Sequence, residues 1–317
     1  MTNFWNNLPK PFFVQAPMEK VTDTVFRQIL ARCGRPDVFF TEFTSTDGLC
    51  SKKGKTRVAR RLQFTDIERP IVAQIWGNKP ENYRKSIAII KEMGFDGIDI
   101  NMGCPVGKVI KRGECSGLIC NPDLVSEIIT TALKSAGDMP VSVKTRIGFK
   151  TIETDSWVRH LLQFPLSALT LHGRTAHEMS KVPAHWDEIE KAVKIRNELK
   201  SKTLIIGNGD VRTHAEGVKK VQTYGVDGIM IGRGFFENLW IFNQDYQPTP
   251  QKSIQMFVEH LRLFDNTWGK TKDFNALKKF FKVYIHKLPN AKELRNKLMR
   301  ETSSEGVLKI LESLSAP

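Results

Sequence analysis

Residues 97–105 read Gly-Ile-Asp-Ile-Asn-Met-Gly-Cys-Pro, an apolar run that meets a glycine and places Cys104 in front of a proline. Gly103 supplies backbone freedom, and Pro105 fixes the direction in which the chain leaves. A residue before proline is biased toward an extended conformation, so the Cys104 side chain is expected to project from a strand tip. A free cysteine is most often an inert small apolar side chain, so a catalytic role for Cys104 depends on the residues around it.

Similar apolar runs recur along the whole chain. The predicted strands are 11–16, 37–42, 70–76, 97–101, 140–146, 168–172, 203–207 and 227–231. Several are apolar throughout, which is typical of strands buried on both faces of a parallel sheet, and helical patterns fill most of the gaps. Gly94 closes a predicted helix at 81–93, and Asn121 with Pro122 predicts the start of another. The repeats predict an α/β fold, a (β/α)8 TIM barrel rather than a doubly wound sheet.

The strand pattern stops after Trp240. We therefore expect a barrel-shaped catalytic domain over residues 1–243, a linker over 244–252, and a smaller all-helical domain over 253–317. Helical patterns cover 253–268, 275–288 and 304–314, and Asn290 with Glu293 predicts a capping box. Residues 49–61, rich in lysine and arginine, are the least helical connection of the barrel.

Charge is the strongest global signal. The 317 residues carry a formal net charge of +14, which attracts polyanions such as nucleic acid, although a lysine-rich proteome would give the same excess. Between Lys270 and Arg300 there are ten lysines and arginines and two acidic residues. A solvated helix face usually explains such a run, but the imbalance makes RNA binding about as favoured.

Composition also indicates the cellular location of the protein and its use of cysteines. No apolar stretch approaches a membrane span, and Trp5 with polar residues stands where a signal peptide needs an apolar run, so we expect a soluble, cytoplasmic protein without a membrane partner. The five cysteines form no C-x-x-C pair and none lies near histidine at zinc-ligand spacing, so neither disulfides nor a metal are expected. We expect a monomer.

Polar residues follow almost every predicted strand. In a TIM barrel the active-site groups lie at the carboxyl ends of the strands, so position nominates Pro17, Met18, Glu42, Gln74, Asn101, Lys144, Arg146, His172, Arg174, Asn208 and Arg233. Each alone is most simply a buried polar group with a structural partner. Packing does not readily explain polar groups at so many strand ends, which indicates a functional rim.

The last two strands end in glycine-rich loops, Gly207-Asn-Gly-Asp210 and Gly232-Arg-Gly234. Barrels commonly bind a phosphate between these two loops, so the loops favour a cofactor phosphate. Gln74 and Lys144 on the opposite strands suit a flat ring across the barrel mouth. FMN fits, with Lys144 near the pyrimidine end and Gln74 at the N3/O4 edge. No G-x-G-x-x-G follows the first strand, which disfavours a tightly held dinucleotide.

Taken together, these motifs resemble those of the tRNA-dihydrouridine synthases. The resemblance spans about residues 11–243 in the family's order, and the helical tail resembles the family's RNA-binding domain. It is carried by Ala16-Pro-Met-Glu19, Thr41-Glu-Phe43, Ala73-Gln74, Asp99-Ile-Asn-Met-Gly-Cys-Pro105, Val143-Lys-Thr-Arg-Ile-Gly148, Leu171-His-Gly-Arg174, Gly207-Asn-Gly209 and Ile231-Gly-Arg-Gly234. One departure is the stretch Lys111-Arg-Gly-Glu-Cys-Ser-Gly117, where the family usually has small residues. Its added Lys111 and Arg112 would suit a phosphate backbone.

The resemblance implies an enzyme with tightly bound FMN that reduces the C5–C6 double bond of a uridine in tRNA and is reloaded by NADPH or NADH. Cys104 would protonate C5 while the flavin delivers hydride to C6. Implied FMN contacts are Pro17, Met18, Gln74, Lys144, His172, Asn208, Gly209, Gly232 and Arg233. Implied substrate contacts are Asn101, Arg146, His172 and Arg174, with Lys278, Lys279 and Lys282 in the tail. The base would have to leave its stack to reach the flavin.

Two alternatives stay open at this stage. A barrel flavoenzyme acting on a free small molecule, such as a dihydroorotate dehydrogenase or an old-yellow-enzyme-type ene-reductase, needs neither the basic tail nor the large net charge. An RNA-binding module that has lost its chemistry predicts an eroded site, whereas Cys104, Lys144 and His172 are all present. Which uridine is reduced, and whether in transfer or ribosomal RNA, is not encoded in these motifs.

Overall fold

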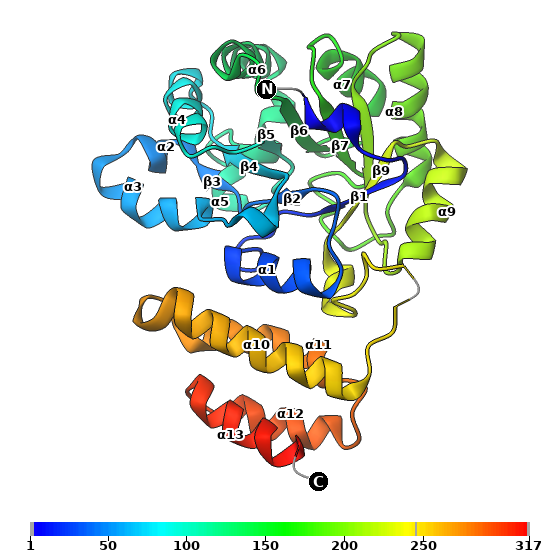
Figure 1. The fold of residues 1–317 in the computed structure, drawn as a ribbon. Coiled ribbons are helices and arrows are strands. Elements are labelled where there is room, and N and C mark those ends of the chain that lie inside the picture. Colours follow the sequence, from blue (N-terminus) through cyan, green and yellow to red (C-terminus); the bar gives the residue numbers. More distant parts are fainter. Residues whose placement is uncertain (1–2, 245, 316–317) are drawn as a thin grey trace.

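The structure, a computed structural model, describes residues 3–244 and 246–315 and contains a closed parallel barrel (Figure 1). The strands are β1 (Phe12–Gln15), β2 (Phe39–Phe40), β3 (Thr44–Ser45), β4 (Ile71–Trp76), β5 (Gly97–Met102), β6 (Val141–Arg146), β7 (Ala168–His172), β8 (Leu204–Asn208) and β9 (Gly228–Ile231). Their order is β1-β9-β8-β7-β6-β5-β4-β2, and β3 also pairs with β4. The barrel closes where the Gln15 N–H donates to the Val38 carbonyl at 3.1 Å. This confirms the predicted TIM barrel.

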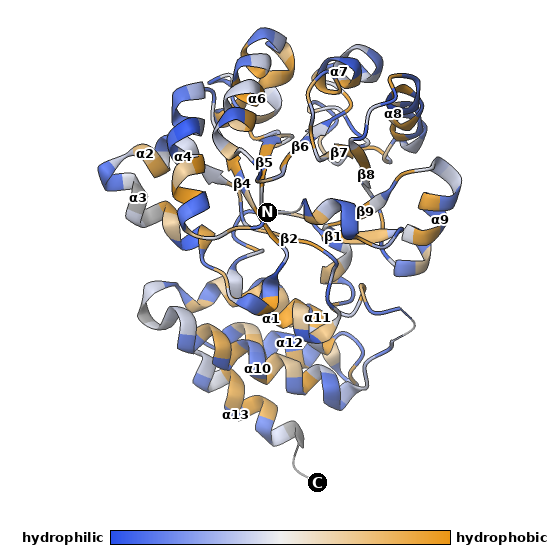
Figure 2. Cartoon of the chain, turned by 45° about the horizontal axis from the view of Figure 1, so that its top comes forward, coloured by the Kyte–Doolittle hydropathy of each residue, from blue (hydrophilic) through white to orange (hydrophobic). Residues whose placement is uncertain are grey.

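Helices surround the strands on the outside of the barrel. They are α1 (Thr24–Cys33), α2 (Thr46–Cys50), α3 (Lys52–Ala59), α4 (Pro80–Glu92), α5 (Gly107–Ile110), α6 (Pro122–Ala136), α7 (Thr154–Leu161), α8 (Trp186–Glu198) and α9 (His214–Tyr224). As predicted, Gly94 follows the end of α4 with φ +76°, and the Asn121 side chain accepts the Leu124 N–H at the start of α6. In Figure 2 most of these helices alternate hydrophilic and hydrophobic stretches, because one face of each packs on the barrel.

The connection over residues 49–61 is helical, so its prediction as the least helical connection is wrong. It contains the end of α2 and the whole of α3, followed by the 3₁₀ turn Arg60–Leu62. Ser45 and Ser51 accept the N–H groups of Gly48 and Gly54 and so cap both helices. Serine caps and the good helix propensity of lysine and arginine account for the difference.

Within the described residues, the C-terminal tail contains the helices α10 (Pro250–Trp268), α11 (Phe281–Ile285), α12 (Ala291–Arg300) and α13 (Ser304–Ser315). Helix α10 begins inside the predicted linker, because Thr249 caps it and Pro250 suits its first turn. The helix predicted over 275–288 is a 3₁₀ segment, Phe274–Phe280, followed by the short α11. The predicted capping box is absent: Asn290 adopts φ +54° and its side chain caps nothing.

Short 3₁₀ turns complete the fold, at Phe4–Asn7, Asp66–Glu68, Cys115–Cys120, Arg233–Phe236 and Gly269–Thr271. No helix within the described residues is long and apolar enough to cross a membrane.

The tail packs directly against α1 of the barrel, as Figure 1 shows. The rings of Phe26 and Phe280 stack with centroids 4.8 Å apart, and the Trp268 indole N–H donates to Asp23 Oδ2 at 3.0 Å. Buried side chains of barrel and tail belong to one continuous apolar cluster. The tail is therefore fixed to the barrel by a shared core.

Candidate active site

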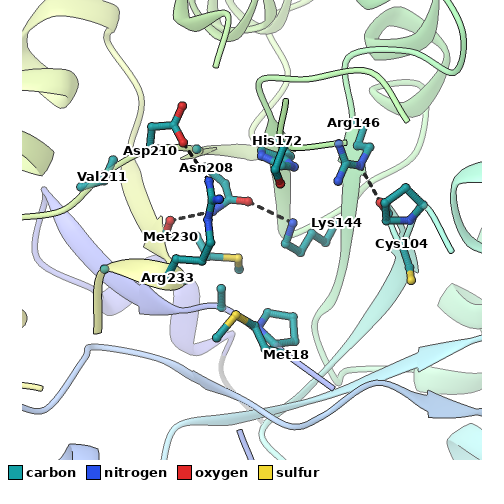
Figure 3. Close-up of a pocket in the computed structure, with 18 of the residues that line it drawn as sticks. Met18, Cys104, Lys144, Arg146, His172, Asn208, Asp210, Val211, Met230 and Arg233 are labelled. Atoms are coloured by element: carbon teal, nitrogen blue, oxygen red, sulfur yellow. Dashed lines mark hydrogen bonds and ion pairs between the residues drawn. The ribbon is translucent and has the colours of Figure 1, made fainter. Parts of the chain in front are cut away.

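A cavity of about 430 Å³ lies at the carboxyl ends of the strands. Figure 3 shows its lining side chains converging from several strands. Of the predicted site residues, those that line it are Pro17, Met18, Asn101, Cys104, Lys144, Arg146, His172, Asn208, Gly209, Gly232 and Arg233. Eleven of the residues predicted at the strand ends and the loops after them therefore line one cavity.

Cys104 lies at one side of this cavity, directly after β5. Asn101 Oδ1 accepts the backbone N–H groups of Gly103 at 3.0 Å and Cys104 at 3.1 Å, and Ser116 Oγ donates to the Cys104 carbonyl at 2.9 Å. A hydrogen bond with the Cys115 thiol, only partly opposed by burial, lowers the pKa of Cys104 to about 7. The thiol is thus held at a defined place and titrates near neutrality.

Lys144 reaches the cavity from the middle of the barrel. Its Nζ donates to Asn208 Oδ1 at 3.2 Å, and Asn208 Nδ2 donates to the Met230 carbonyl at 2.8 Å. Burial and the charge of Arg146 lower the pKa of Lys144 to about 8. Below that pH the ammonium offers a positive charge to a bound group.

His172, at the end of β7, is neutral. Burial and the surrounding cations, led by Lys144 and Arg146, hold the pKa of His172 well below its usual value. Its Nε2 lies 3.2 Å from a guanidinium nitrogen of Arg174, which can only donate, so Nε2 accepts and Nδ1 carries the proton.

Asp210 organises the two arginines predicted at this edge of the rim. Its carboxylate accepts from Arg174, from the Ala184 N–H at 3.0 Å and from Arg233 at 3.0 Å. Burial alone would raise the pKa of Asp210, but these bonds and both guanidinium charges hold it below its usual range. Arg174 is buried behind His172 and Asp210 and does not line the cavity.

Four further predicted residues lie elsewhere. Gln74 is fully buried beneath the cavity, where both ends of its amide are bonded to Asp99 and Asn101. Lys278 donates to the Met299 carbonyl at 2.9 Å, Lys279 donates to the Lys20 carbonyl, and Lys282 is exposed on α11. Lys278 and Lys279 are therefore bonded to different parts of the chain.

Sequence reasoning did not nominate several lining residues, among them Phe43, Ser180, Asp210, Arg212, Met230 and Glu237. Asp210 could have been found, because it ends the Gly-Asn-Gly-Asp loop of β8. Ser180 lies in a long loop after β7, where neither periodicity nor motif marks it.

The glycine-rich side of the cavity leaves room for a bound cofactor. At Gly232 an added Cβ would meet only Ala16 Cβ at 3.5 Å and Met18 Sδ at 3.8 Å, which are ordinary contacts. Because Ala16, Met18 and Gly232 all line the cavity, that Cβ would take up its space. Glycine at this position therefore leaves that space open to a ligand. No group of three or more His, Cys, Asp or Glu arranged for a metal occurs among the described residues.

Comparison with known proteins shows the family to which the chain belongs. Residues 14–316 match the family model described as dihydrouridine synthase, and the chain belongs to this family. Family membership confirms the predicted flavin-dependent oxidoreductase, with a flavin cofactor and a nicotinamide reductant.

Two curated relatives cover nearly the whole chain. A Bacillus subtilis protein named probable tRNA-dihydrouridine synthase 2 is 46% identical over 98% of this chain and 96% of its own length. A Staphylococcus aureus protein named probable tRNA-dihydrouridine synthase is 44% identical over 99% and 96%. Among solved structures, morphinone reductase in complex with tetrahydroNAD matches with TM-score 0.51 at 12% identity, over 78% of this chain and 92% of its own. That likeness concerns the barrel fold alone, so the small-molecule alternative is not favoured.

Proposed function

We propose that this chain reduces the C5–C6 double bond of a uridine in tRNA, with tightly bound FMN as hydride carrier and NADPH or NADH as reductant. The observation that carries the proposal is one cavity with the Cys104 thiol on one side and Lys144, His172, Asn208 and Arg233 on the other. Cytoplasmic tRNA would be the substrate, in line with the names of the relatives.

The chain's own residues suit the cofactor as follows. Arg233 and the backbone of Gly209 and Gly232 would hold the phosphate, with Pro17 and Met18 beside it. Lys144 would face the pyrimidine end of the ring, where its charge stabilises the reduced form. FMN supplies the hydride that is added to C6.

Cys104 supplies the proton. Uracil is an α,β-unsaturated carbonyl, so hydride addition at C6 builds negative charge that is discharged by a proton at C5. The Cys104 thiol transfers its proton to C5, and its sulfur is left as the thiolate. Asn101, His172 and Arg146 would orient the base.

Basic groups around a second cavity support an RNA substrate. This cavity of about 420 Å³ lies between barrel and tail, and its cationic lining residues are Lys20, Arg60, Arg61, Lys272 and Lys279. Asp23 and Glu42 also line it, and Asp23 pairs with Lys272 at 2.7 Å. The net positive lining suits an RNA phosphate backbone that runs from the tail toward the barrel rim.

The test is Cys104→Ala in the purified flavin-loaded enzyme. We expect unchanged FMN content and tRNA affinity, but single-turnover reoxidation of the reduced enzyme by unmodified tRNA about 10²–10⁴-fold slower, the usual contribution of a general acid. Small enones serve as the control acceptor, and Cys120→Ala as the matched exposed cysteine. Fast reoxidation by enones and none by tRNA in the wild type would refute the RNA substrate. A normal rate in Cys104→Ala would exclude this thiol as the donor.

A further inference from the structure

Beneath the cavity, three buried polar side chains form a hydrogen-bonded chain between β4 and β5. Asp99 Oδ2 accepts from Gln74 Nε2 at 2.7 Å, and Gln74 Oε1 accepts from Asn101 Nδ2 at 2.9 Å. Asn101 Oδ1 then accepts the N–H groups of Gly103 and Cys104. Asp99 and Gln74 are 0% exposed and Asn101 is 4% exposed. This series of hydrogen bonds therefore runs from the Asp99 carboxylate to the backbone of Cys104.

The Asp99 carboxylate fixes which groups donate and which accept along this series of hydrogen bonds. An ionised carboxylate only accepts, so Gln74 must turn its N–H₂ group toward Asp99 and its oxygen toward Asn101. Asn101 must in turn present N–H₂ to Gln74 and its oxygen to the two backbone N–H groups. A reversed amide at either step would set donor against donor, and a buried unpaired donor costs about 1–3 kcal/mol.

We propose that Asp99 is a positioning residue for the Cys104 thiol, acting through the fixed orientation of the Gln74 and Asn101 amides. It does not line the cavity, and its side chain is hydrogen-bonded to Gln74 and Ser142. The proposal rests on Cys104 as the proton donor of the proposed reaction.

The surroundings of Asp99 keep it an acceptor. Ser142 Oγ donates to its other oxygen at 2.6 Å. Burial raises the pKa of Asp99 to about 6, against the hydrogen bonds of Ser142 and Gln74 and the charge of Lys144. At neutral pH the group is therefore a carboxylate, and both of its oxygens are committed.

The test uses three variants of the flavin-loaded enzyme. Asp99→Asn keeps shape but removes the acceptor-only group, so the two amides are free to reverse. Asp99→Asn combined with Gln74→Glu moves the carboxylate one step along the chain: the new amide donates to it, and Asn101 N–H₂ still finds an acceptor. Ser142→Ala is the control, because it removes a bond to Asp99 and leaves the bond to Gln74 intact; since the Ser142 bond also lowers the pKa of Asp99, the control is compared only above the pH at which Asp99 is ionised.

The first readout is the pH midpoint of Cys104 alkylation by iodoacetamide, followed on the Cys104 peptide by mass spectrometry. For Asp99→Asn we expect the midpoint to rise by about one pH unit toward the ordinary cysteine value, since a displaced strand tip moves the Cys104 thiol away from Cys115. Single-turnover reoxidation by tRNA should fall about tenfold to a hundredfold. The double variant should restore the wild-type midpoint, and Ser142→Ala should keep it.

A wild-type midpoint in folded Asp99→Asn would overturn the proposal, even with a lower unfolding temperature, because Asp99 would then serve stability alone. If Asp99→Asn does not fold, the double variant decides: a wild-type midpoint supports the proposal and a shifted one refutes it. The alkylation profile needs no RNA. Failure of wild-type enzyme to be reoxidised by tRNA would therefore count against the proposed function and not against the role of Asp99.

Discussion

At the scale of single residues, the stretch 111–117, where the sequence departs from the family pattern, places the Cys115 thiol beside the Cys104 thiol. Cys115 is fully buried, and burial holds the pKa of its thiol well above the usual value. It therefore stays protonated and donates to Cys104, whose pKa falls to about 7. In the proposed reaction Cys104 is a general acid, which works in its protonated form, so this contact would set the pH above which proton transfer to C5 declines.

We predict that Cys115→Ala moves that decline to higher pH. Removing the largest lowering contribution raises the pKa of Cys104 toward the ordinary value of about 8.5, so the thiol stays protonated over a wider range. The measurement is the pH profile of single-turnover reoxidation by tRNA, from pH 6 to about 9. Cys120→Ala, in the same 3₁₀ turn but exposed, is the control. An alkaline limb that stays near pH 7 in Cys115→Ala would contradict the assignment.

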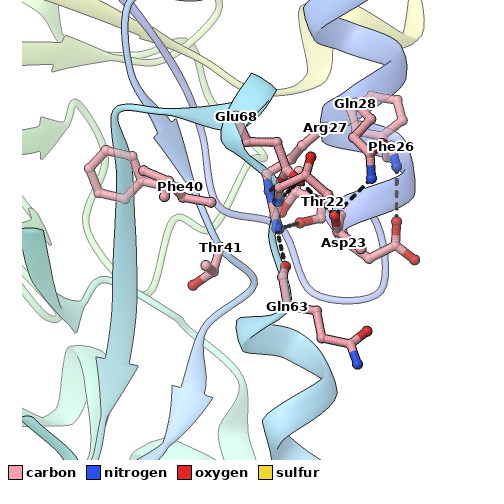
Figure 4. Close-up of polar contacts among 12 residues, drawn as sticks. Thr22, Asp23, Phe26, Arg27, Gln28, Phe40, Thr41, Gln63 and Glu68 are labelled. Atoms are coloured by element: carbon pink, nitrogen blue, oxygen red, sulfur yellow. Dashed lines mark hydrogen bonds and ion pairs between the residues drawn. The ribbon is translucent and has the colours of Figure 1, made fainter. Parts of the chain in front are cut away.

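At the scale of elements, a buried ion pair joins α1 to the 3₁₀ turn Asp66–Glu68, as Figure 4 shows. Arg27 and Glu68 are both 0% exposed and lie 2.5 Å apart. The guanidinium also donates to the carbonyls of Thr22 and Gln63, at 2.5 and 2.7 Å, and Thr24 Oγ1 donates to Glu68 Oε1 at 2.6 Å. The tail packs on α1, so this ion pair also stabilises the part of the barrel that contacts the tail.

We predict that breaking this pair from either side destabilises the protein strongly. Arg27→Met and Glu68→Gln should each lower the free energy of unfolding by about 3–5 kcal/mol, since each leaves a buried charge without its partner. Urea denaturation of the two single variants and the double variant measures it. The double variant should lose less than the sum of the singles. Single losses under about 1 kcal/mol would mean that the pair contributes no more than an exposed one.

Elements also show what the sequence could and could not predict. Strand positions followed from apolar runs, and the cavity followed from the strand ends, because barrel topology alone brings those ends together. The partners of polar groups did not follow: Gln74 bonds Asp99 rather than facing the cavity, and Arg174 stands behind Asp210. Such pairings depend on side-chain directions across neighbouring strands and loops, which periodicity does not encode. The segment at 274–280, predicted as part of a helix, is a 3₁₀ segment whose Phe280 ring stacks on Phe26 of α1, a contact that periodicity does not encode.

At the scale of the whole molecule, barrel and tail meet through both apolar and basic surfaces. Truncation after Asn243 would expose Phe26, Phe235 and their neighbours, so the isolated barrel is expected to lose solubility. Beside this core lies the basic cavity, with Arg60 and Arg61 from the barrel and Lys272 and Lys279 from the tail. An RNA that bound there would contact both parts at once.

We predict that the tail lysines contribute to tRNA affinity by binding phosphates. Replacing Lys278, Lys279 and Lys282 together by glutamine should weaken tRNA binding and reduce its salt dependence, by about 0.7–0.9 in the slope of log K against log salt for each phosphate that is no longer neutralised. Since Lys278 and Lys279 are already bonded to carbonyls and Lys282 is exposed, Lys282→Gln alone should give the largest single share.

The matched control replaces Lys91, Lys134 and Lys194, exposed on barrel helices α4, α6 and α8, which removes the same three charges from the net +14. Affinity measured from 50 to about 300 mM salt separates local phosphate binding from general attraction, because only the phosphates that a protein neutralises set the slope. Equal losses of affinity in both triple variants would show that net charge, not the tail, attracts the RNA. An unchanged slope in the tail variant would move the docking surface to the basic stretch 49–61 of the barrel. FMN content and NADPH oxidation by a small acceptor should stay at the wild-type level in both, because neither triplet lines the active-site cavity.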